Sequence, residues 1–146
     1  LLFHSYGAGV GALGLLLAGL LGNLVNAWVH VGAHASLGAS TAVFGAVGLL
    51  GGSEARARHL LREPQARRIA PIAAALMLLL YLGVGEAQPT RNVDVLAHVF
   101  GLLVGLALGT VLGSFPRALI EHRGAQLAAG LVAAALLASC WLVVLT

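Results

Sequence analysis

Five long apolar runs, separated by polar connections, dominate the hydrophobic pattern of the chain. They occupy residues 8–29, 38–52, 69–84, 93–113 and 125–145. Lipid offers the backbone no hydrogen-bond partner, so an apolar run of this kind crosses a membrane as a helix, in which these bonds close within the segment. The pattern predicts an all-α fold, a polytopic transmembrane helical bundle with about five membrane helices in this chain.

The composition points the same way. Hydrophobic residues make up 60% of the 146 residues and charged residues 9%, whereas a soluble domain carries about 25% charged residues. The mean hydropathy of +0.97 is high for a soluble protein. The single cysteine, Cys140, lies in the last apolar run and has no partner for an internal disulfide.

The arginines carry information about topology. The eight basic residues are all arginine, the formal net charge is +3, and every arginine except Arg91 falls within residues 53–68 or 114–124. These two connections share one side of an alternating topology, and the positive-inside rule makes that side cytoplasmic. We therefore interpret the arginines as a membrane-topology signal and expect no nucleic-acid partner.

The second apolar run is too short to span a membrane. Residues 38–52 rise only ~22 Å as a helix, against a hydrocarbon core of ~30 Å. Ser40, in its first turn, is therefore expected below the outer surface, where unpaired backbone N–H groups can stabilise an anion, as in an oxyanion hole. A structural alternative is that a small hydroxyl residue simply packs between helices, and this stretch alone favours that alternative.

A histidine at a similar depth favours the catalytic interpretation of Ser40 over the packing one, because a serine needs a base to become a nucleophile. His98 lies ~7 to 8 Å from the outer end of its run, a depth similar to that of Ser40. An intramembrane histidine is by default a functional residue, although a hydrogen-bonded structural role is the alternative. Small residues at helical spacing allow the two runs to pack closely, namely Gly38, Gly45, Gly48 and Gly52 in one and Ala97, Gly101, Gly105 and Gly109 in the other.

These two motifs together resemble the rhomboid family of intramembrane serine proteases. The family pattern Gly-x-Ser-x-x-x-x-Gly, followed later by Ala-His-x-x-Gly, is matched by Gly38, Ser40, Gly45, Ala97, His98 and Gly101. The resemblance covers residues 8–113. It implies that Ser40 is the nucleophile and His98 the general base of a dyad without an obligatory acid. Gly38, Ala39, Phe44 and Gly101 are the supporting residues that it implies, with Phe44 packed against the histidine.

The resemblance also implies upstream elements that are not seen in this sequence. Rhomboids carry a His-x-x-x-Asn motif in an earlier helix, whereas His4 is followed four residues later by Ala8. We therefore expect a fragment that lacks the N-terminal helices. In this interpretation residues 1–113 form a partial protease domain, and residues 114–146 form a cytoplasmic loop plus an extra C-terminal transmembrane helix.

The expected activity is that of an intramembrane serine endopeptidase, which cleaves transmembrane or juxtamembrane segments of other membrane proteins. Its partners would be these substrates and membrane lipid, and its chemistry needs no metal or organic cofactor. The expected location is a bacterial inner membrane, with several passes, and the oligomeric state stays open. The competing hypothesis is a catalytically inactive relative that binds transmembrane helices without cutting them.

The other polar residues in and near the apolar runs are weaker candidates. Asn23 and Asn26, within the family-like stretch AGLLGNLVN, are expected to tie neighbouring helices or loops together. His30 and His34 have the spacing of a metal pair, but without a following acidic ligand they are interpreted as loop residues. Asp94 lies one turn before His98 and either orients it or is a solvated charge at the helix end.

Overall fold

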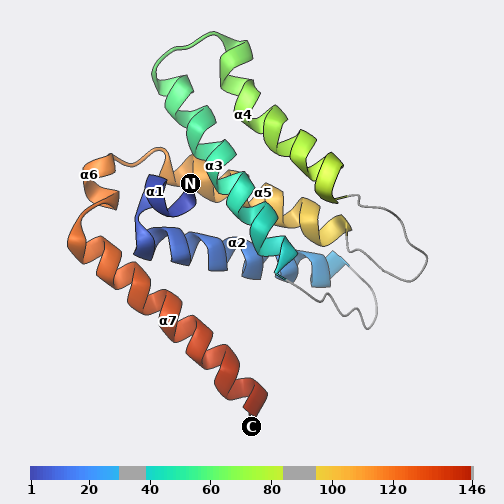
Figure 1. The fold of residues 1–146 in the computed structure, drawn as a ribbon, viewed down its shortest axis with the longest axis vertical. Helices are drawn as coiled ribbons and strands as arrows, with labels where there is room; N and C mark the ends of the chain where they lie inside the picture. The colour runs from blue at the N-terminus through green and yellow to red at the C-terminus, as the bar shows by residue number, and fades with distance from the viewer. Residues whose placement is uncertain (30–38, 84–94, 146) are drawn as a thin grey trace.

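The computed structural model describes residues 1–29, 39–83 and 95–145, which are helical throughout apart from short turns (Figure 1). No strand occurs within these three ranges, so the all-α prediction is confirmed. The helices are α1 (Leu2–Tyr6), α2 (Ala8–Val29), α3 (Ser40–Leu60), α4 (Gln65–Leu78) with a π-helical continuation (Leu79–Gly83), α5 (Val95–Leu112), α6 (Arg117–Ile120) and α7 (Arg123–Leu145).

Helices α3 and α5 lie side by side and run in the same direction. Their residues meet in the same order along both helices. Gly101 lies against Thr41, Gly105 against Gly45 and Gly109 against Leu49. A Cβ atom on each of these three α5 glycines would lie only 2.1 to 2.3 Å from a carbonyl oxygen of α3. The backbones therefore touch, a spacing that only glycine permits at these positions.

Helix α2 crosses the same pair in the opposite direction. Gly14 of α2 lies near Leu49, and Gly22, two turns later, lies against Thr41 and Gly101. Beyond this glycine contact, Phe44 and Leu102 form the hydrophobic core with Ala75 of α4. Helices α2, α3 and α5 thus pack tightly against one another, and α4 covers one side of α3 (Figure 1).

Three helices among the described residues are long and apolar enough to cross a membrane, namely residues 8–29, 95–112 and 123–143. Helices α3 and α4 are the other two long helices, and neither meets that criterion. Many large apolar side chains on the outside of the bundle are exposed, as a surface in contact with lipid requires. The structure is that of a helical membrane bundle.

Helix α3 is longer than the sequence pattern predicts. Its expected end was residue 52, but the helix continues to Leu60 and carries the charged segment as two further turns. Alanine, arginine and glutamate favour helix, and Arg58 forms an i, i+4 ion pair with Glu54 at 2.9 Å. Likewise, α4 begins at Gln65 directly after Pro64, rather than at residue 69, because proline is well tolerated at a helix start.

Helix α7 stands apart from the bundle except near its first turns (Figure 1). Gln126 holds it there: its Nε2 donates to the carbonyl oxygens of Tyr6 and Ile120 at 2.7 Å, and its Oε1 accepts from the amides of Gly9 and Val10. One side chain thus satisfies two of the unpaired N–H groups at the start of α2. The rest of α7 is almost entirely exposed.

Candidate functional site

The parallel direction of α3 and α5 brings the starts of both helices to the same end of the bundle. Ser40 is the first residue of α3, and its neighbour Thr41 lies against Gly101. His98 lies three residues before Gly101, one turn nearer the start of α5. The register of the glycine contact therefore places the candidate nucleophile and the candidate base at corresponding heights.

An aromatic contact joins the two helices at this end. The rings of Phe44 and His98 have centroids 4.6 Å apart and an interplanar angle of 36°. Both side chains are 6% exposed, so the imidazole is held in a dry interface. Ser40 lies one helical turn before Phe44 on the same side of α3, and it is exposed. The starts of α3 and α5 thus carry an exposed serine and a buried histidine at the same end of the bundle.

The start of α3 provides unpaired backbone donors. Ala39 is the N-cap residue, and because its side chain has no oxygen it cannot cap the helix. The first backbone bond of α3 runs from the amide of Val43 to the carbonyl of Ala39 at 3.1 Å. The amides of Ser40, Thr41 and Ala42 precede this bond, and the positive end of the helix dipole lies with them.

A polar tie behind Ser40 fixes the position of α3. The hydroxyl of Thr41 donates to Oδ1 of Asn23 at 2.8 Å, and Thr41 is only 2% exposed. Asn23 was expected to tie helices together, and this bond between α2 and α3 confirms it. Sequence reasoning did not single out Thr41 as a positioning residue. The only available signal was its hydroxyl next to Ser40 in an otherwise apolar run.

Gly101 has a packing role at this site. A Cβ atom here would lie 2.3 Å from the carbonyl oxygen of Thr41, so any side chain would push α5 away from α3.

Asn26, the second expected polar tie, is 1% exposed. Five further residues discussed from the sequence lie outside the described residues, namely His30, His34, Gly38, Arg91 and Asp94.

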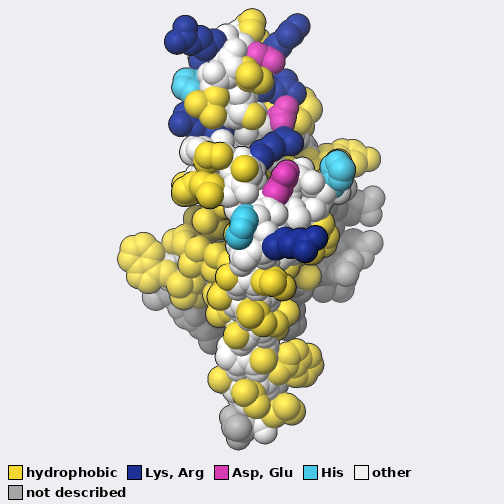
Figure 2. Space-filling view, turned by 90° about the vertical axis from the view of Figure 1, so that its left-hand side faces the viewer, with side chains coloured by type: hydrophobic (Ala, Val, Ile, Leu, Met, Phe, Trp, Pro, Cys, Tyr) yellow, Lys and Arg dark blue, Asp and Glu magenta, His cyan; other side chains and the backbone are white. Residues whose placement is uncertain are grey.

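The arginines that the structure describes, all except Arg91, lie at the opposite end of the bundle. Nε of Arg56 donates to the hydroxyl of Ser114 at 2.9 Å, which joins the two arginine-rich connections directly. Figure 2 looks onto this side of the molecule, where arginine, acidic and histidine side chains gather above the apolar surface of α7. A cavity of about 670 Å³ also lies here, lined by Tyr6, Glu54 and Arg117 among others. It is remote from Ser40, so it is not part of the candidate site.

In the ranges that the structure describes, no group of three or more histidine, cysteine or carboxylate side chains is placed to hold a metal ion. His98, the buried histidine of the candidate site, packs on an aromatic ring instead.

Comparison with known proteins identifies the family. The family model described as the Rhomboid domain matches residues 2–115, which is most of the chain. We found no significant match among curated proteins or among solved structures. The matched region contains the glycine-packed helices, the buried histidine and the exposed serine at one end of them. This chain, an integral membrane protein, therefore belongs to the rhomboid family.

Proposed function

We propose that this rhomboid-family chain is an intramembrane serine endopeptidase with Ser40 as nucleophile and His98 as general base. The observation that carries the proposal is the contact of Phe44 with His98 in the α3–α5 interface. It packs the imidazole at the end of the bundle where α3 begins with the exposed Ser40. Catalysis by a dyad requires that the base be oriented, and packing on the ring of Phe44 supports this orientation.

The reaction follows from these positions. His98 takes the proton of the Ser40 hydroxyl as Oγ attacks a substrate peptide carbonyl, and the negative charge on the oxygen is stabilised by the first amides of α3. The imidazolium then gives the proton to the leaving amine, and the peptide bond breaks to leave an acyl-enzyme on Ser40. Water, deprotonated by His98, hydrolyses the ester and restores the serine.

The position of the site suggests the substrate class and the side of cleavage. The seven described arginines lie at the other end of the bundle, so by the positive-inside rule the site opens toward the outer face. Transmembrane or juxtamembrane segments of other membrane proteins are the chains that reach such a depth. We assign residues 1–113 to the partial protease domain and place the protein in a bacterial inner membrane, with residues 114–146 as a cytoplasmic loop plus an extra C-terminal transmembrane helix.

Labelling with a serine-directed fluorophosphonate tests the proposal. The purified protein in lipid should be labelled, and Ser40→Ala or His98→Gln should abolish both labelling and cleavage of a transmembrane substrate. Ser139→Ala is the matched control, because Ser139 is an exposed serine in α7 that donates to the carbonyl of Leu136. Full cleavage by the folded Ser40→Ala protein would overturn the assignment. Substrate binding without labelling or cleavage would favour the inactive, helix-binding alternative.

A further inference from the structure

The turn between α3 and α4 ends α3 with an arginine where glycine is usual. Arg62 has a φ of 55°, in the left-handed region. Its amide donates to the carbonyl of His59, and the amide of Glu63 donates to the carbonyl of Arg58, both at 3.1 Å. This pattern is a Schellman motif, whose left-handed position is normally glycine because a side chain is strained there. The chain keeps a long cationic side chain at this position despite the strain.

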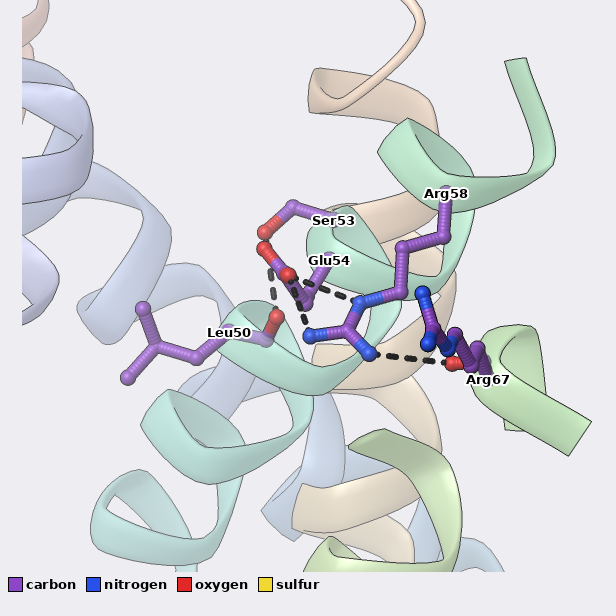
Figure 3. Close-up of polar contacts among 5 residues, drawn as sticks. All are labelled: Leu50, Ser53, Glu54, Arg58 and Arg67. Atoms are coloured by element: carbon purple, nitrogen blue, oxygen red, sulfur yellow. Dashed lines mark hydrogen bonds and ion pairs between the residues drawn. The ribbon is translucent and has the colours of Figure 1, made fainter. Parts of the chain in front are cut away.

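The arginines of this hairpin fall into two sets. Arg56, Arg58 and Arg68 each donate to a neighbouring group of the protein, and Figure 3 shows the bonds from Arg58 to Glu54 and to the backbone of Arg67. The guanidinium groups of Arg62 and Arg67 differ. Both residues are exposed, and neither side chain has a hydrogen-bond or ion-pair partner within residues 1–29, 39–83 and 95–145. Two exposed cations, one in the turn and one in the first turn of α4, thus have their donors available.

Two exposed leucines directly precede Arg62 in the chain. Leu60 is 57% exposed and Leu61 73% exposed, at the end of a helix that also carries charge. An apolar pair next to unpaired arginines is typical of a segment that sits at the boundary between acyl chains and headgroups. In water an exposed leucine side chain is unfavourable, whereas at the acyl boundary the same side chain is removed from water.

The height of the turn along the bundle agrees with that boundary. The last turn of α5, a candidate membrane span, ends level with Ser53, since a Cβ on Gly113 would lie 3.0 Å from the Cα of Ser53. From Ser53 to Leu60 the helix rises about 10 Å. The interfacial layer adds about 5 to 8 Å beyond the hydrocarbon on each side, and the oblique course of α3 relative to α5 (Figure 1) reduces the height reached. The turn therefore lies at headgroup level.

We propose that the α3–α4 turn binds the phosphate headgroups of anionic phospholipids through Arg62 and Arg67, with Leu60 and Leu61 entering the acyl boundary. Charge complementarity favours this occupant. The hairpin of residues 53–68 contains five arginines and two glutamates, and one of those glutamates, Glu54, is paired with Arg58. Guanidinium groups bind phosphate oxygens in a bidentate manner, and an anionic membrane leaflet presents such phosphates at this depth.

The test measures lipids retained by the full chain. The protein in detergent is titrated with phosphatidylglycerol or phosphatidylcholine, and bound lipid is counted by native mass spectrometry. We expect preferential retention of phosphatidylglycerol. Since one arginine near an anionic surface contributes about fivefold in affinity, the double variant Arg62→Gln/Arg67→Gln should bind it about 25-fold more weakly. Arg58→Gln is the matched control, because it removes one charge from the same hairpin but a charge already paired with Glu54.

Arg62→Gly separates the lipid role from a structural one. Glycine suits the left-handed position, so this variant should keep or raise the thermal midpoint of the protein while binding phosphatidylglycerol more weakly. Arg62→Lys, which keeps the charge, should retain most of the binding.

Four outcomes would overturn the proposal. They are equal retention of the two lipids, unchanged phosphatidylglycerol binding by the folded double variant, a loss in Arg58→Gln as large as that in the double variant, and equally effective competition by inorganic phosphate at matched concentration. The last result would indicate a site for a free anion.

Discussion

The ring of Phe44 packs against the ring of His98 with centroids 4.6 Å apart, and this contact joins α3 to α5 at the end of the bundle where Ser40 begins α3. Both rings are buried, so neither can turn without disturbing the interface. The glycine contacts on the following turns hold the two backbones in register. The histidine is thus held in the interface at the end of the bundle where α3 begins.

Truncation of Phe44 should weaken both stability and catalysis. Phe44→Ala leaves a cavity in the α3–α5 interface and is expected to cost about 3 kcal/mol of unfolding free energy. It also frees the imidazole of His98, so kcat should fall more than KM rises. Phe44→Leu fills most of the volume and should recover more stability than turnover. Denaturant unfolding and steady-state cleavage measure the two effects, and equal recovery of both would contradict an orienting role.

Alanine at Gly101 should separate the two helices of the site. The new Cβ would meet the carbonyl oxygen of Thr41 at 2.3 Å, and a backbone atom cannot move aside as a side chain can. We expect a loss of about 1 to 3 kcal/mol, the usual effect of overpacking, together with loss of activity. Gly130→Ala is the control, since its nearest neighbour, the Cα of Gly9, is 3.7 Å away. Equal stability of the two variants would argue against the close α3–α5 contact.

Removal of the Thr41 hydroxyl should loosen the start of α3. Thr41→Val preserves the shape but leaves Oδ1 of Asn23 without this donor, at a cost of about 1 to 3 kcal/mol. Because Thr41 adjoins Ser40, cleavage should slow as well. A double-mutant cycle with Asn23→Ala measures the coupling, which is expected to be at least 0.5 kcal/mol for a direct hydrogen bond. Strictly additive effects of the two substitutions would show that the bond contributes nothing.

Membrane topology can be checked with single cysteines in a Cys140→Ala background. Gln65 begins α4 at the arginine end, and Gln88 lies in the connection that is expected to face outward, outside the described residues. An impermeant thiol reagent applied to intact cells should label Gln88→Cys and spare Gln65→Cys. Permeabilised cells, in which both positions become accessible, provide the control. The reverse pattern would invert the topology and the side of cleavage.

Much of this architecture could be predicted from local sequence patterns. Apolar runs between arginine-rich connections predicted long helices and the all-α bundle, because the backbone in lipid has no other way to satisfy its hydrogen bonds. Small residues every fourth position predicted that α3 and α5 would approach closely, and their backbones do touch at Gly105 and Gly109. The family, too, was recognisable from Ser40 and His98 with their neighbouring glycines, and the family match over residues 2–115 confirms it.

Other features depend on contacts between distant segments and were decided by the tertiary structure. The continuation of α3 to Leu60 is further stabilised where its charged turns contact Ser114 after α5 and the backbone of Arg67 in the first turn of α4, contacts that an apolar boundary in the sequence could not reveal. Thr41 became a positioning residue only because α2 places Asn23 beside it. The division of the arginines into paired and unpaired sets likewise depends on which groups the folded helices bring within reach. Local pattern determines which segments are helices, whereas the partner of each polar side chain is set by helices that are far apart in sequence.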